Sequence, residues 1–238
     1  MSFMDKAAGV FYEPSRVFES LKSGVKTVDW LVPVLLLAIL ASISTYVRFT
    51  SPDLRFQMME QQEQRFDHMV AQGKMTADQA QQAKDRMNSG SPAFAGIGMF
   101  GAFVVTFIIF FIAAGVWLLI GKFALKGTMT YSQTMGMAGI ASWIMIVGVI
   151  VATALSVLLS RLDGGLNLGM LTQMNAESKV YTLMRNVDLF TLWNLAVTSI
   201  GLGVLASKKG AMPAIYVYGT WVVLVVISVF ALGGAFGM

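Results

Sequence analysis

The residues most able to do chemistry are few in this 238-residue chain, which has one histidine and no cysteine. The lack of cysteine excludes disulfides, thiolate catalysis and cysteine-ligated metals. His68 adjoins Asp67 and follows Glu60 and Glu63, but position 64, one helical turn earlier, is Gln64. A zinc site needs three or four converging ligands. We therefore expect no metal and no cofactor, and we interpret His68 as a surface residue of a hydrated helix.

Catalysis or proton relay inside a membrane would require ionisable side chains at membrane depth, where they are costly and usually functional. The long apolar stretches of this chain carry none at their centres. Serine–histidine hydrolysis, aspartyl protease chemistry and proton-coupled transport therefore lack their reagents. We expect no catalytic residues and a protein that is not an enzyme. A channel or a lipid-moving protein stays open, because neither class needs such groups.

Composition places the chain in a lipid bilayer. Hydrophobic residues make up 56% of it and charged residues 13%, and the mean hydropathy is +0.67. A soluble domain carries roughly 25% charged residues. The net charge is +4, but the basic residues stand at the ends of apolar stretches and do not form a patch interleaved with aromatics. This pattern is a topology signal and argues against a nucleic-acid partner.

Five apolar stretches approach or exceed the roughly 20 residues that span a bilayer. They predict an all-α polytopic membrane protein, a bundle of five transmembrane helices over about 30–47, 94–121, 134–159, 188–206 and 213–236. The chain then divides into a cytoplasmic amphipathic segment, 1–29, and a five-helix membrane domain, 30–238. Each of the five prolines is expected near the start of a helix, where a missing N–H does little harm. The first span is expected to stay uncleaved, because a long polar leader precedes it.

Two segments outside the spans have patterns of their own. Residues 14–28 place apolar side chains on one helical face: Val17, Phe18, Leu21, Val25 and Val28. This stripe predicts an N-terminal interfacial helix; the alternative is a short helix packed on the bundle. Residues 51–92 predict a polar helical hairpin between the first two spans, and Thr76 with Gln79 forms a capping-box pattern that opens its second helix.

Orientation follows from the short loops. The loops after the second and fourth spans hold Lys122, Lys126, Lys208 and Lys209 and contain no acidic residue. Basic short loops face the cytoplasm, and the N-terminus lies on the same side of a five-span protein. We expect a multi-pass protein of the cell inner membrane with a cytoplasmic N-terminus.

Small residues recur at helix-packing intervals in two spans. In the third span they are Ala141, Gly148, Ala152 and Ser156, and in the fourth span Ser199 and Gly203 lie four residues apart. Such spacing lets helix backbones approach closely. Packing within the chain and contact between copies in a homo-oligomer both remain open.

The start of the fourth span is the most distinctive string, with Asp188, Phe190, Trp193 and Asn194. Asp188 is placed to cap the helix and complement its dipole. Asn194 is suited to a hydrogen bond between helices, as polar side chains in membranes often are. The alternative is that these four residues contact a ligand.

This string, Asp188-Leu-Phe190-Thr-Leu-Trp193, with Ile200-Gly201-Leu202-Gly203 after it, resembles the fourth helix of Yip-domain proteins. Two further strings agree with that family. They are Pro14-Ser-Arg-Val-Phe18-Glu-Ser-Leu21 before the first span and Gly127-Thr-Met-Thr-Tyr131-Ser before the third. The resemblance extends over most of the chain and includes the five-span layout.

The resemblance implies a five-helix domain with a cytoplasmic N-terminus. Eukaryotic Yip-domain proteins are linked to Rab GTPases, vesicle formation and membrane shaping, and they carry a longer N-terminal segment. Residues 1–29 indicate the prokaryotic type, and the polar hairpin departs from the eukaryotic pattern. We expect a non-enzymatic protein that organises membrane or recruits partner proteins. The alternative is a small transporter, channel or lipid-moving protein without proton-relay residues.

Overall fold

The computed structural model describes residues 1–88, 92–173, 175 and 178–231, and these are helical apart from loops and one isolated β-bridge. Among them, four helices are long and apolar enough to cross a membrane. They are α3 (Thr27–Thr50), α6 (Pro92–Leu119) with its π-helical extension Ile120–Ala124, α7 (Tyr131–Leu158) and α10 (Met212–Ala231). The predicted fourth span is α9 (Leu189–Leu205), an apolar helix of 17 residues.

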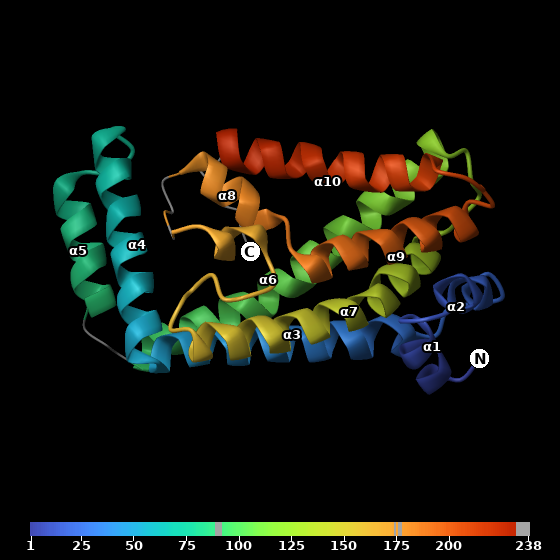
Figure 1. Ribbon diagram of the computed structural model, residues 1–238, viewed down its shortest axis with the longest axis horizontal. Helices are drawn as coiled ribbons and strands as arrows, with labels where there is room; N and C mark the ends of the chain where they lie inside the picture. Colours follow the sequence, from blue (N-terminus) through green and yellow to red (C-terminus); the bar gives the residue numbers. More distant parts are fainter. Residues whose placement is uncertain (89–91, 174, 176–177, 232–238) are drawn as a thin grey trace.

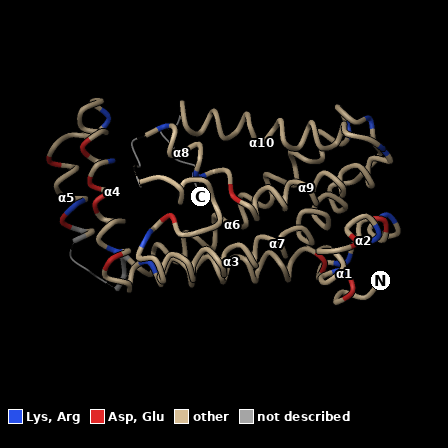
Figure 2. The backbone as a smooth tube through the Cα atoms, in the orientation of Figure 1, with Lys and Arg blue, Asp and Glu red and all other residues tan. Residues whose placement is uncertain are grey.

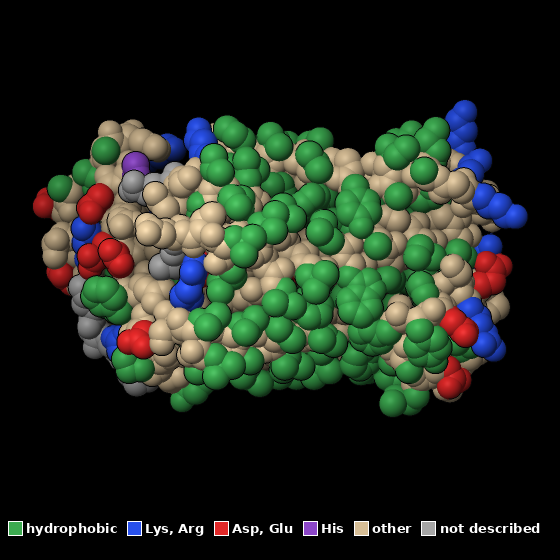
Figure 3. Space-filling model, in the orientation of Figure 1, with side chains coloured by type: hydrophobic (Ala, Val, Ile, Leu, Met, Phe, Trp, Pro, Cys, Tyr) green, Lys and Arg blue, Asp and Glu red, His purple; other side chains and the backbone are tan. Residues whose placement is uncertain are grey.

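The long helices run side by side along the longest axis of the molecule (Figure 1). α3 packs against both α6 and α7, while α9 packs on α7 and carries α10 on its other side. Charged positions gather at the two ends of this axis, apart from those in the chain between α7 and α9 (Figure 2). On the face that Figure 3 shows, apolar side chains gather between the ends. This distribution is that of a protein whose middle faces lipid.

One end of the bundle carries two short helices, α1 (Phe3–Gly9) and α2 (Pro14–Leu21). We call this the N-terminal end. Val17, Phe18 and Leu21 of α2 are completely buried, and α2 packs against α9 and α7. The part of the apolar stripe in α2 therefore faces the bundle, which corrects the interfacial prediction in favour of the packed alternative, whereas Val28, in α3, has an exposure of 43%.

Two glycines explain why α2 packs so closely. A Cβ atom at Gly201 of α9 would lie 3.0 Å from Cδ2 of Phe18, and one at Gly136 of α7 would lie 2.8 Å from Cγ1 of Val25. The side chains of the N-terminal segment thus occupy notches that larger residues would fill. Sequence periodicity identifies an apolar face but does not show these notches, which lie on other helices.

The proline prediction needs one correction. α3 begins at Thr27, earlier than the predicted Trp30, so Pro33 lies inside this helix. The first turn of α3 therefore includes Asp29, which is buried with a relative exposure of 1%. The charge-free stretch 30–47 still describes the remainder of the span up to Arg48.

The opposite end, called here the hairpin end, carries α4 (Pro52–Ala71), α5 (Ala77–Asn88), the 3₁₀ turn η2 (Leu168–Leu171) and α8 (Lys179–Asn186). α4 and α5 lie side by side beyond the long helices (Figure 1), and Lys84 Nζ lies 2.8 Å from Asp67 Oδ1 between them. The capping box at the start of α5 is formed by Thr76 and Gln79, which exchange hydrogen bonds of 3.0 and 3.2 Å. The predicted hairpin boundary near residue 92 falls partly on 89–91, outside the described residues.

Candidate functional site in the chain between α7 and α9

Asp188 and Asn194 make contacts that hold α9 in place. Asp188 is the N-cap of α9, and its Oδ1 accepts hydrogen bonds of 3.0 Å from the backbone N–H groups of Phe190 and Thr191. Asn194 Nδ2 donates to the carbonyl oxygen of Ala141 on α7 at 2.9 Å. The first contact completes a helix terminus, and the second joins two helices.

Phe190 and Trp193 point to different neighbours. Phe190 is buried over Gly148 of α7, where a Cβ would lie 2.8 Å from Phe190 Cβ. Trp193 meets the ring of Phe11, between α1 and α2, edge to face at 5.7 Å. Each of the four residues of the string thus contacts a different part of the chain, and a ligand-contacting role stays a prediction.

The predicted small residues contact other parts of the same chain. On α7, Gly148 meets Phe190, Ala152 lies beside Gly165 and Ser156 lies against Gly164. On α9, Ser199 donates to its own helix at Leu195 O, and Gly203 lies beside Pro213 of α10.

These contacts bring the chain between α7 and α9 back into the bundle. The Gly164 backbone lies directly against Ser156, so closely that a Cβ there would overlap the Ser156 backbone. Asn167 and Asp188 form the isolated bridge, and Leu189 N–H donates to Leu166 O at 2.9 Å. α9 therefore starts beside Gly148, ten residues before the last residue of α7. At 1.5 Å per residue this shortens α9 by about 15 Å relative to α7.

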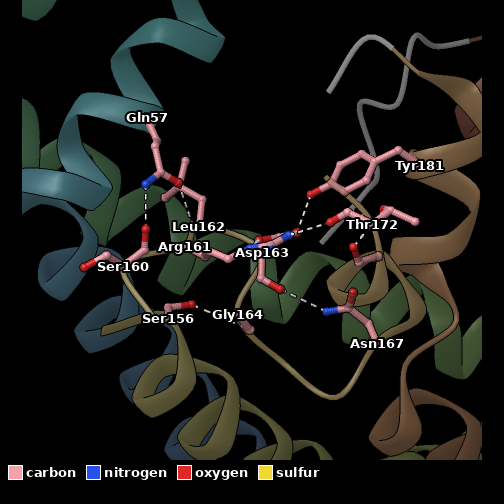
Figure 4. Close-up of polar contacts among 11 residues, drawn as sticks. Gln57, Ser156, Ser160, Arg161, Leu162, Asp163, Gly164, Asn167, Thr172 and Tyr181 are labelled. Carbon is pink, nitrogen blue, oxygen red and sulfur yellow. Dashed lines mark hydrogen bonds and ion pairs between the residues drawn. The ribbon is translucent and has the colours of Figure 1, made fainter. Parts of the chain in front are cut away.

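A polar cluster, which we call the Asp163 network, lies in this returning chain (Figure 4). Asp163 has a relative exposure of 3%. Its carboxylate accepts two hydrogen bonds from Arg161, of 2.9 Å from Nε and 2.8 Å from Nη2, and one of 2.6 Å from the Tyr181 hydroxyl. Arg161 Nη2 also donates to Thr172 O at 3.2 Å, and Asn167 Nδ2 donates to Asp163 O at 3.0 Å.

The network is fastened to α4 through Gln57. Its Nε2 donates to Ser160 O at 2.7 Å, and its Oε1 accepts from Leu162 N–H at 3.1 Å. Ser160 Oγ donates to Asp53 Oδ2 at 2.8 Å. The polar hairpin is thus tied by side chains to the loop that positions α9 (Figure 4).

Hydrogen bonds within the network stabilise the charged forms of Asp163 and Arg161 and the neutral form of Tyr181. Burial acts to raise the pKa of Asp163, but hydrogen bonds from Arg161 and Tyr181 outweigh it and hold the pKa below its usual value. Burial and the hydrogen bond to Asp163 raise the pKa of the Tyr181 phenol. The hydrogen bond to Asp163 raises the pKa of Arg161. At neutral pH the network is therefore an ionised Arg161–Asp163 pair with a neutral Tyr181 phenol.

Sequence reasoning missed this network, because only Arg161 and Asp163 are close in sequence. Two further polar atoms here are Arg48 Nε, at the end of α3, and Asn167 Oδ1. Both are buried and have no hydrogen-bond partner in the described part of the chain.

A second buried ion pair lies at the N-terminal end. Lys6 Nζ of α1 lies 2.7 Å from Asp29 Oδ2 of α3, and the two residues have relative exposures of 5% and 1%. Asp29 Oδ2 also accepts from Lys26 N–H at 2.9 Å, which caps α3. The pair joins α1 to the first span and was not predicted, since its members are 23 residues apart.

Cavities lie at both ends of the bundle. One of about 510 Å³ lies between α4 and α8, beside Tyr181, and one of about 470 Å³ lies between α2, α9 and the start of α10. Within the described residues, no three His, Cys, Asp or Glu side chains group closely enough to hold a metal ion.

The four long apolar helices and the charge-poor middle of the bundle define a multi-pass membrane protein. The Yip1 domain matches residues 8–233, and the chain belongs to this family. The match covers α2 to α10, including the Asp163 network and the three strings that carried the resemblance, at 14–21, 127–132 and 188–203. Searches of curated proteins and of solved structures find no match.

Proposed function

We propose that the chain is a non-enzymatic protein of the cell inner membrane that recruits partner proteins to its N-terminal end, or organises membrane there. In this proposal it crosses the bilayer five times, with α9 as the fourth and shortest crossing, and the N-terminus lies in the cytoplasm. The lysines of the short loops support this orientation. Membership of the Yip1 family supports a role in membranes.

The observation that carries the proposal is the layer formed by α1 and α2 over the end of the bundle. The apolar face of α2 is buried, while its charged side chains point outward, with side-chain exposures of 74% for Arg16 and 49% for Glu13. The Lys6–Asp29 pair and the burial of Phe18 hold this layer against the long helices. A fixed, charged surface beside the membrane is suited to binding a protein partner or a second copy of the chain.

Site-specific photo-crosslinking in native membranes tests the proposal. A photoreactive amino acid replaces Arg16 on the outward face of α2. The control replaces Val223 of α10, an apolar residue with an exposure of 56% that faces outward from the bundle. We expect discrete protein adducts at position 16, identified by mass spectrometry, and mainly lipid adducts at position 223. Absence of any partner or self-adduct at position 16 would count decisively against recruitment.

Polar groups at the hairpin end favour a second candidate function, passage of a small polar solute or a lipid headgroup. Arg48 Nε and Asn167 Oδ1 have no hydrogen-bond partner among the described residues. Thr153 of α7 donates to Ser44 of α3 at 2.9 Å, one helical turn before Arg48. Purified protein in liposomes would be assayed for ion flux and for lipid movement between leaflets. This candidate function requires that ion flux or lipid movement be faster than in protein-free liposomes, and slower for Arg48→Gln than for the wild type. Equal rates in all samples would rule out this function.

A further inference from the structure

The cavity of about 470 Å³ at the N-terminal end combines a charged rim with an apolar wall. Its rim includes Lys22, just after α2, and Lys208 and Lys209, just after α9. Its wall includes Ile200 and Val204, which lie one turn apart on α9. Two segments distant in sequence, 15–22 and 199–214, thus form one space lined by both charged and apolar residues.

The rim carries an excess of positive charge. Glu19 is the acidic residue that lines the cavity, and its Oε2 lies 3.0 Å from Lys22 Nζ. Lys208 and Lys209 are exposed, and neither has an ion-pair partner among the residues that the structure describes. Three lysines against one glutamate leave two positive charges without a counter-charge. Such a rim favours an anionic ligand.

The apolar wall continues onto the outer surface of the bundle. Ile200 has an exposure of 38%, and Met212 and Ile215, at the start of α10, have exposures of 56% and 60%. The cavity therefore lies where the exposed apolar surface of α9 and α10 meets the lysines of the loop between them. A ligand that fills it would have a charged head next to apolar chains.

We propose that this cavity binds an anionic phospholipid. The lipid phosphodiester contacts Lys208 and Lys209, and an acyl chain lies against Ile200 and Val204. Gly203, which also lines the cavity, lets the start of α10 approach α9 closely, since a Cβ there would lie 3.1 Å from Cγ of Pro213. Free phosphate would use the lysines alone and leave the apolar wall uncovered. The proposal depends on the cavity lying at the membrane boundary and is independent of partner recruitment.

Lipid binding by the full-length protein tests this proposal. Protein purified in a neutral detergent is titrated with phosphatidylglycerol or with phosphatidylcholine, and bound lipid is measured by native mass spectrometry. The test variant is Lys208→Gln/Lys209→Gln. The control is Lys122→Gln/Lys126→Gln, which removes the same charge from the same end but from residues that do not line the cavity.

We expect phosphatidylglycerol to bind in preference to phosphatidylcholine. Each lysine near an anionic lipid contributes about fivefold, so the test variant should bind about 25-fold more weakly, while the control stays within about threefold of the wild type. Equal losses in both variants would overturn the proposal, because they would indicate attraction by overall charge. Unchanged binding in the test variant, or full displacement of the lipid by inorganic phosphate, would also overturn it.

Discussion

Asp163 is held ionised in a buried position by Arg161 and Tyr181, so its charge and its neighbours depend on one another. Asp163→Asn removes the charge and leaves Arg161 without its partner. We expect a loss of about 2–3 kcal/mol in the free energy of unfolding. The measurement is thermal or denaturant unfolding of the purified protein. Asp67→Asn, which breaks the exposed pair with Lys84, is the matched control and should cost less than about 1 kcal/mol.

Asp163 should also make the free energy of unfolding depend on pH. Because the pKa of Asp163 is lower in the folded protein than its usual value, the unfolded chain binds this proton more readily. The stabilisation is therefore complete at neutral pH and is lost as the pH falls below about 4. The difference in unfolding free energy between wild type and Asp163→Asn should narrow below that pH. A difference that stays constant down to about pH 2 would contradict this account.

Lys6 and Asp29 form the other buried pair, and a double-mutant cycle tests how it acts. Lys6→Met alone leaves a buried, uncompensated carboxylate and should cost about 3–5 kcal/mol. Adding Asp29→Asn removes that charge, retains an acceptor for Lys26 N–H and should restore most of the loss. If the two changes simply add, the pair does not couple α1 to α3.

Among the elements, α2 depends on burial of its apolar face. Phe18→Ala should cost about 3–5 kcal/mol, because Phe18 is fully buried against α9. Phe56→Ala on α4 is the control, since Phe56 has an exposure of 69%. Limited proteolysis should then cut residues 1–26 rapidly in the Phe18 variant only. Equal protection of both variants would show that α2 is not held by this face.

The position of α9 depends on the close contact between Gly164 and Ser156. Gly164→Ala should destabilise the protein by about 1–3 kcal/mol, because the added methyl group overlaps the α7 backbone. Gly115→Ala on α6 has open space around it and removes a flexible residue from a helix. It should be neutral or stabilising by up to about 1 kcal/mol. Both variants are measured by thermal or denaturant unfolding. A neutral effect of Gly164→Ala would contradict the role of this close contact.

Much of the helical layout could be predicted from the sequence, because apolar length alone indicates a spanning helix. All five helices follow the predicted stretches as far as the structure describes them, residues 232–236 of the last stretch lying outside the described residues. α9 is the shortest of the five, because Gly164 and Gly165 pack the preceding chain against α7. The Asp163 network and the Lys6–Asp29 pair could not be predicted in this way. Their members come from separate segments, and nothing in the local pattern specifies which loop residue meets which helix.

At the scale of the whole molecule, the helices place two kinds of surface at opposite ends of an apolar belt (Figures 2 and 3). The N-terminal end carries α1, α2 and the lysines of the two short loops. The hairpin end carries α4, α5 and the Asp163 network. Both proposals, recruitment of partner proteins and binding of an anionic lipid, require the whole N-terminal end to lie on a single side of the membrane.

The chain is proposed to cross the membrane five times, with α9 as the shortest crossing. Cysteine accessibility tests this topology most directly. The natural chain has no cysteine, so single replacements at Glu13, Gln81 and Lys209 can be labelled with a membrane-impermeant maleimide in spheroplasts. We predict that position 81 reacts in intact spheroplasts, whereas positions 13 and 209 react only after permeabilisation. Labelling of position 209 together with position 81 in intact spheroplasts would mean that α9 does not cross the membrane, and it would contradict the claim.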